Sequence, residues 1–225
     1  MKSGSEALLL LADGRLPAGG YAHSGGMEAA VRNSSVKDAA DLQKFLTGRA
    51  TTSGAVAASF AAAACRICTE QDFELIAELD MEFTARTPSP ALRKVSETLG
   101  RQLLRAVAAI HPHMFQQHLP TRLHHPVAFG SAAAMFGLSP VEAARGILHE
   151  TLMGPAMSVV KIMSIDPFEA HRAVAALIPL LDEVSEDAAL YANAPFKDLP
   201  SYGAPLSDLL AEHHETTQGV RLFAS

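Results

Sequence analysis

Residues 92–110 read LRKVSETLGRQLLRAVAAI and carry the most regular apolar pattern in the chain. The apolar side chains recur every three or four positions, which places them on one face of an α-helix. The members of this stripe are Leu92, Val95, Leu99, Leu103, Ala106 and Ile110. Pro88 and Pro90 mark the break in front of it. The segment is therefore predicted to be an amphipathic helix with one side against a core.

Further helix signals surround this segment. Residues 139–142 (SPVE) combine a capping serine, a proline at the first helical position and an acid at the third. Residues 166–169 (DPFE) repeat that order, and residues 35–38 (SVKD) resemble a capping box. Gly154-Pro155 is expected to kink or split the helix that begins after Ser139. The stretch 185–204 is rich in turn-forming residues and is predicted to be a loop.

The composition of the 225 residues limits the classes of function. Hydrophobic residues make up 48% and charged residues 19%, values typical of a folded globular chain. Alanine is abundant and β-branched runs are few, which favours helix over strand. The net charge of −6 argues against nucleic acid as the main partner, because phosphate binding needs a basic face. We predict one all-α domain over residues 1–225, a helical bundle of about ten helices.

Three observations bear on localisation. No run of about 18 or more apolar residues is present, so no membrane-spanning helix is expected. The short leucine run at residues 8–11 lies between Glu6 and Asp13, which is unlike a signal peptide. The chain has two cysteines, Cys65 and Cys68, and so few cysteines suit a reducing compartment. We therefore expect a cytoplasmic protein with no membrane partner.

A glycine-rich stretch at residues 17–26 (PAGGYAHSGG) is predicted to be a flexible loop. A phosphate-binding loop would need a preceding strand and a Lys-Ser or Lys-Thr pair, and neither is found here. A nucleophile elbow would need glycine two residues before Ser24, where Ala22 stands. Nucleotide binding and acyl-enzyme chemistry are thus disfavoured. Ordering Tyr21 and His23 beside four glycines is costly, so we expect this loop to become ordered against a partner.

Three other features have both a structural and a functional interpretation. The spacing of Cys65 and Cys68 resembles redox and zinc motifs, but no second ligand pair follows and buried thiols are favoured. The five histidines between His111 and His125 could bind nickel or zinc, although a solvated linker is favoured because no carboxylate or cysteine accompanies them. Lys161 stands in an apolar run and is either a snorkelling side chain or an interface residue. None of these features predicts a catalytic group, a resident metal or a cofactor.

Ordered motifs along the whole chain resemble the urease accessory protein F family (UreF). The family opening, Leu-Pro-x-Gly-Gly-aromatic and then Gly-aliphatic-Glu, is similar to residues 16–21 (LPAGGY) and 26–28 (GME). Its Gly-Arg-x-Leu-Leu and Pro-Val-x-Phe-Gly segments resemble residues 100–104 (GRQLL) and 126–130 (PVAFG). Its closing His-Glu and Arg-Leu-Phe-x-Ser resemble motifs within residues 214–225.

The resemblance implies an all-α protein without catalytic activity of its own. Members bind a second urease accessory protein, called D or H, and together they recruit the GTPase accessory protein G to apo-urease. GTP hydrolysis is coupled there to delivery of nickel to the metallocentre. Members commonly form dimers, so a homodimer is expected. The resemblance leaves open whether GTP hydrolysis is accelerated or restrained, and whether nickel binds this subunit or only passes it.

The predicted partner contacts lie mainly near the two ends of the chain. By the family match, the glycine-rich loop and a flexible tail at residues 215–225 are the best candidates for contact with the D/H protein. The Leu-Phe pair of the tail would gain about 2 kcal/mol per side chain on burial in a partner groove. The full predicted set is Tyr21, His23, Ser24, Glu28, Lys161, His214, Glu215, Arg221, Leu222 and Phe223. The alternative is a helical metal-binding protein or metalloenzyme that uses the His111–His125 cluster.

Overall fold

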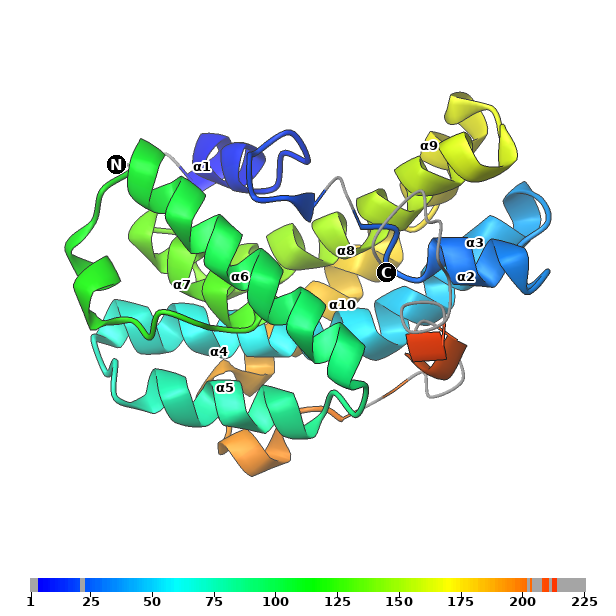
Figure 1. The fold of residues 1–225 in the computed structure, drawn as a ribbon. Helices are drawn as coiled ribbons and strands as arrows, with labels where there is room; N and C mark the ends of the chain where they lie inside the picture. Colours follow the sequence, from blue (N-terminus) through cyan, green and yellow to red (C-terminus); the bar gives the residue numbers. More distant parts are fainter. Residues whose placement is uncertain (1–3, 21–22, 202, 204–207, 211, 214–225) are drawn as a thin grey trace.

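The computed structural model describes residues 4–20, 23–201, 203, 208–210 and 212–213, and this part of the chain folds as packed α-helices (Figure 1). Its ten α-helices are α1 (Gly4–Leu11), α2 (Met27–Arg32), α3 (Ala39–Arg49), α4 (Ala55–Glu70), α5 (Leu75–Ala85), α6 (Pro90–Ile110), α7 (His125–Met135), α8 (Pro140–Met163), α9 (Pro167–Ala175) and α10 (Ile178–Leu190). Shorter helical segments are η2 (Ala50–Gly54), η3 (Met114–His118), η4 (Tyr191–Asn193) and η5 (Phe196–Asp198). The all-α prediction is confirmed. None of the described helices is both long and apolar enough to cross a membrane.

Helix α4 occupies the centre of the bundle, and α7, α8 and α10 pack along it. Twelve of its sixteen side chains are buried, and half of those twelve are alanine. Small side chains let neighbouring helix backbones approach closely. A β-carbon at Gly130 of α7 would lie only 2.1 Å from the carbonyl oxygen of Ala61 in α4. Phe60 and Phe129 are the largest fully buried side chains and fill the space that remains.

Helix α6 begins at Pro90, the second proline of the predicted break, and its apolar stripe divides into two parts. The C-terminal part packs on α7, where Leu103 is fully buried. The N-terminal part is half-buried and lines a cleft; it consists of Leu92, Val95 and Leu99. The partly open stripe is the first indication of where a functional site lies.

The predicted start signals of α8 and α9 are confirmed. Ser139 and Glu142 form a capping box, in which the Ser139 backbone N–H donates to Glu142 Oε2 at 2.7 Å and the Glu142 N–H donates to Ser139 Oγ at 3.4 Å. Asp166 caps α9, since its side chain accepts the Phe168 N–H at 2.8 Å. Each cap satisfies backbone donors that the helix itself leaves unpaired.

Three local predictions were wrong. The cap of α3 is Asp38, whose Oδ1 accepts the Asp41 N–H at 2.9 Å, so the helix begins later than a box at residues 35–38 requires. Residues 185–190 continue α10, because burial of Ser185 in this part of α10, which packs on α4, outweighs the nearby turn formers. The third prediction fails in part: Gly154-Pro155 does not split α8, which continues through both residues to Met163, while the kink expected as the other outcome stays a prediction.

Candidate functional site

The glycine-rich loop lies across α6 and α8, and its glycines allow that approach. Gly19 has a φ of +86°, and a β-carbon there would come within 2.0 Å of Gln102 Oε1. Gly25 has a φ of +56°, and a β-carbon there would meet Pro155 Cγ at 3.0 Å and Arg49 Nη2 at 3.1 Å. A larger residue at either position would strain the backbone and displace the loop. The flexibility expected of this loop stays a prediction.

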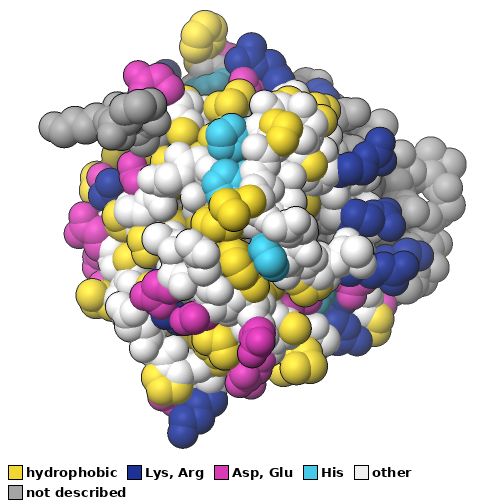
Figure 2. All heavy atoms as spheres, turned by 90° about the vertical axis from the view of Figure 1, so that its left-hand side faces the viewer, with side chains coloured by type: hydrophobic (Ala, Val, Ile, Leu, Met, Phe, Trp, Pro, Cys, Tyr) yellow, Lys and Arg dark blue, Asp and Glu magenta, His cyan; other side chains and the backbone are white. Residues whose placement is uncertain are grey.

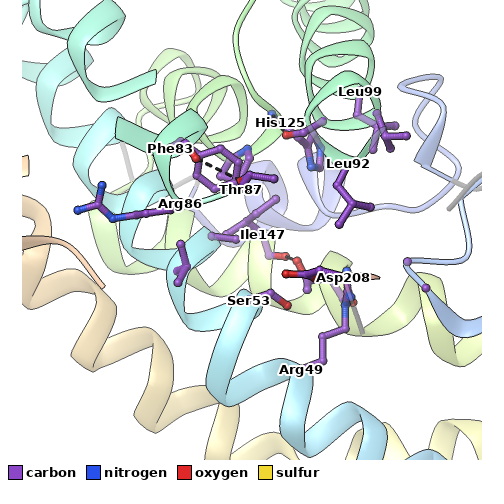
Figure 3. A pocket seen from close by; sticks show the side chains of 18 of the residues that line it. Arg49, Ser53, Phe83, Arg86, Thr87, Leu92, Leu99, His125, Ile147 and Asp208 are labelled. Carbon is purple, nitrogen blue, oxygen red and sulfur yellow. Dashed lines mark hydrogen bonds between the residues drawn. The ribbon is translucent and has the colours of Figure 1, made fainter. Parts of the chain in front are cut away.

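A cleft of about 240 Å³ lies beside this loop (Figure 3). The half-buried part of the α6 stripe forms an apolar wall, and residues of α4 and α8 also line the cleft. The loop contributes His23, and the C-terminal segment contributes Gly203 and Asp208. The other polar and charged lining residues are Arg49, Ser53, Arg86, Thr87, Ser96, His125 and Thr151. Segments from near both ends of the chain therefore meet at one cleft.

Arg49 is held at this cleft by a carbonyl group that a proline leaves free. In a regular α-helix, the Thr151 carbonyl would accept the backbone N–H of residue 155. Pro155 has no N–H, so the Thr151 carbonyl needs another donor. Arg49 Nε donates to this carbonyl oxygen at 3.1 Å. The proline inside α8 thus fixes a guanidinium group that comes from α3.

Arg49 and Asp208 bring opposite charges into the cleft (Figure 3). Burial lowers the pKa of Arg49, and the Asp208 carboxylate acts against this shift. Burial also raises the pKa of Asp208, and the Arg49 guanidinium acts against that shift. The attraction is strengthened because both groups are partly removed from water. This attraction links Asp208 of the C-terminal segment to Arg49 of α3, which in turn contacts α8.

A second polar contact joins the helices around the cleft. His125 Nε2 lies 3.5 Å from Glu150 Oε1, so the first turn of α7 meets the middle of α8. A β-carbon at Gly20 would lie 3.1 Å from the same carboxylate oxygen, which places the loop over this contact. The His125 backbone N–H donates to Ser96 Oγ of α6 at 3.0 Å. The loop therefore rests on a framework that α6, α7 and α8 build together.

The structure brings only part of the predicted set to the cleft. His23 lines it, whereas Ser24 and Glu28 are buried, and Ser24 Oγ accepts the Glu28 N–H at 3.4 Å. Glu28 also pairs with Arg32 at 2.9 Å. Lys161 is exposed in the last turn of α8 and does not line the cleft. The remaining candidates lie outside the described residues; they are Tyr21, His214, Glu215, Arg221, Leu222 and Phe223.

The histidines of the segment 111–118 pack against phenylalanine rings. His111 stacks on Phe136 with ring centroids 4.4 Å apart, and His118 stacks on Phe73 at 4.9 Å. Figure 2 looks onto this end of the bundle and shows histidine side chains lying between hydrophobic ones. The segment expected to be a solvated linker is thus partly docked on the bundle through its rings.

Hydrogen bonds limit these imidazoles as metal ligands. His113 Nδ1 accepts the Phe115 N–H at 3.2 Å, so the neutral ring carries its proton on Nε2. His111 Nε2 lies 3.1 Å from the Met135 carbonyl oxygen, and only a protonated nitrogen can donate to that oxygen. Across the described residues, no three or more His, Cys, Asp or Glu side chains are grouped to hold a metal ion. The described geometry therefore gives the metal-binding alternative no support.

Cys65 and Cys68 are free thiols buried in α4. Cys65 Sγ donates to the Leu138 carbonyl oxygen at 3.2 Å. Burial raises the pKa of Cys65 to about 12 and that of Cys68 to about 11. A reactive or metal-binding cysteine needs a thiolate, which these surroundings disfavour. The structure therefore supports the interpretation of Cys65 and Cys68 as buried apolar side chains.

Sequence analysis missed Arg49 and Asp208, the charged pair of the cleft. Arg49 belongs to no motif, and its bond to Thr151 spans 102 residues. A proline inside a helical pattern does predict a free carbonyl four residues earlier. It does not identify the donor, because tertiary packing decides which side chain reaches that carbonyl.

Comparison with known proteins agrees with the motifs. The UreF family model matches residues 36–178. A protein of Mycolicibacterium vanbaalenii named urease accessory protein UreF is 38% identical over 218 residues, 97% of each chain. Proteins with the same name from Mycobacterium marinum and Mycobacterium tuberculosis are 38% and 36% identical, over 97% and 92% of this chain and 97% and 93% of their own. On this similarity over nearly the whole length, the chain belongs to the UreF family of urease accessory proteins.

Proposed function

We propose that this protein is a non-catalytic scaffold of urease maturation. It binds the D/H accessory protein and recruits the GTPase accessory protein G to apo-urease, where GTP-dependent nickel insertion completes the metallocentre. It acts in the cytoplasm as a homodimer. Membership of the UreF family supports the link to urease, and the names of the relatives describe accessory proteins.

The observation that supports this proposal is that the glycine-rich loop and the segment that precedes the predicted tail both contribute residues to one cleft. His23 of the glycine-rich loop and Asp208 of the C-terminal segment both line it. A partner that contacts the loop on this side can therefore contact the C-terminal segment at the same time. Engaging two segments through one interface raises the affinity, because the second contact becomes intramolecular.

The apolar wall of the cleft supports the same role. Leu92, Val95 and Leu99 lie on the helical stripe that elsewhere packs in the core, yet they are only half-buried. Covering each of them with a partner side chain would contribute about 1 kcal/mol, roughly half the value for burying a fully exposed side chain. Arg49, which lines the same cleft, adds directional hydrogen-bond donors to this surface.

Co-expression tests the proposal. The protein, the D/H protein and the G protein are expressed together, purified through one tag, and analysed by size exclusion with light scattering. A ternary complex is expected, and deletion of residues 221–225 or the substitution Arg49→Met should remove it. Arg172→Met, at an exposed position of α9, is the matched control and should leave the complex intact. A wild-type protein that stays alone while its partners are soluble would contradict the scaffold role.

A further inference from the structure

Three cations form a row on the outer face of α6. Lys94, Arg101 and Arg105 are exposed, and their spacing of seven and four residues places them on one side of the helix. At about 1.5 Å per residue the row is about 17 Å long. Figure 2 shows Lys and Arg side chains gathered along its right-hand margin, on the side of the molecule where α6 runs. We call these three residues the α6 cationic row.

No ion pair within the described part of the chain neutralises this row. The ion pairs among the described residues use other lysines and arginines. Glu97, the one acidic residue of α6, lies one turn from Lys94 and from Arg101 but forms an ion pair with neither, and its charge acts on Asp80 and His124. Arg101 and Arg105 are one helical turn apart, and like charges at that spacing destabilise a helix slightly. In a chain of net charge −6, a row of cations that does not stabilise the fold is best explained as a binding surface for an anionic partner.

A hollow of about 560 Å³ joins the row to the glycine-rich loop. Arg105 belongs both to the row and to this hollow. The described residues that line the hollow include no carboxylate; they are Pro17, Gly19, His23, Gln102, Arg105, Ala106 and Ala109. A polypeptide segment seated against His23 would therefore reach the α6 cationic row through this hollow.

We propose that the α6 cationic row binds an acidic segment of the D/H accessory protein, whose Asp or Glu side chains pair with Arg101 and Arg105. The inference rests on the proposed function and adds the chemistry of the partner's contact surface. Carboxylates match the row in charge and can accept two parallel hydrogen bonds from a guanidinium group. Continuity with the loop through the hollow places this acidic segment beside the first contact. Exposed charges of this kind act mainly on the association rate and are screened by salt.

Charge reversal provides the first test. Binding of the D/H protein is measured for the wild type, for R101E/R105E and for the control K37E/R172E, which reverses two exposed cations on other elements. Both variants move the net charge from −6 to −10, because each reversal changes it by −2. R101E/R105E should lose about 100-fold in affinity at low ionic strength, mostly through slower association, and the control should lose at most about threefold. The difference should shrink in about 1 M salt, where the Debye length is about 3 Å.

Zero-length carbodiimide cross-linking identifies the partner group, because it joins an amine to a carboxylate in direct contact. Lys94 of the wild type should be linked to an Asp or Glu of the D/H protein, as read by mass spectrometry. Lys94→Arg should keep the charge and the binding but lose that link. Equal affinities for R101E/R105E and K37E/R172E, or no cross-link at Lys94, would refute the binding role proposed for the α6 cationic row while leaving the scaffold role intact. Absence of any wild-type binding would overturn both.

Discussion

Asp80 carries an unfavourable charge at neutral pH, and its replacement by asparagine is expected to stabilise the protein. Its Oδ1 accepts the backbone N–H of His124 at 2.7 Å. Burial raises the pKa of Asp80 to about 6, and the neighbouring Glu97 carboxylate adds to the shift. In Asp80→Asn the amide oxygen can still accept the His124 N–H, while the charge is gone.

The pH window follows from the direction of this shift. In the unfolded chain, an aspartate titrates at about pH 3.9. Between about pH 4 and pH 6, Asp80 therefore binds more protons in the folded state than in the unfolded state, so stability falls as the pH rises. The pKa of His124 is lowered by burial, and its contribution is lost as the pH falls below its unfolded value. His124 is present in both proteins and largely cancels in their difference.

The magnitude can be bounded from the same shift. A rise of the Asp80 pKa from 3.8 to about 6 corresponds to about 3 kcal/mol at about 1.4 kcal/mol per unit. Asp80 is only partly buried, so solvent screening reduces the expected gain to about 1 kcal/mol. Urea unfolding followed by circular dichroism should show Asp80→Asn more stable than the wild type by this amount at about pH 7.5, and equal to it at about pH 4. A loss of stability at the higher pH, or the same change at both, would refute the reasoning.

Two further predictions concern the core. Gly130→Ala should lower the unfolding free energy by about 3 kcal/mol, because its β-carbon would meet the Ala61 carbonyl oxygen at 2.1 Å. Gly48→Ala is the control, because no atom lies within 4 Å of its new β-carbon, and it should raise the unfolding free energy by up to about 1 kcal/mol. If the two substitutions lowered the melting temperature equally, the close packing of α4 on α7 would be contradicted. Cys65 and Cys68 should resist iodoacetamide in the folded protein and react once urea unfolds it, as read by mass spectrometry, because burial raises both pKa values; rapid labelling of the folded protein would rule this out.

The parts of the fold that could be predicted depend on local chemistry. The capping residues Ser139 and Asp166 act within one turn of their own helices, so sequence alone locates those helix starts. The periodic stripe of α6 predicted a helix of the right length for the same reason. Residues 185–190 were assigned wrongly because their helix is decided by packing of α10 on α4, which no local signal reports.

The candidate site was predictable only in part, because its residues act across long sequence separations. Motifs and glycine content singled out the loop, and His23 does line the cleft. Gly19 and Gly25 let the loop approach α6 and α8, a tertiary contact that glycine content alone does not identify. The charged pair of the cleft consists of Arg49 in α3 and Asp208, which are 159 residues apart in the sequence.

The clearest sequence signal for the cleft was a violation of a local rule. Proline within a helix removes a hydrogen bond and is unfavourable unless the surrounding structure compensates. Here Arg49 donates a hydrogen bond to the Thr151 carbonyl that Pro155 leaves free. Gly25 can approach the Pro155 ring because glycine has no side chain. The backbone hydrogen bond that α8 lacks is therefore replaced by a contact with α3, and the glycine-rich loop packs at the same place. Departures from local preference that are compensated by tertiary contacts tend to mark functional sites, and this one lies at the cleft that His23 and Asp208 both line.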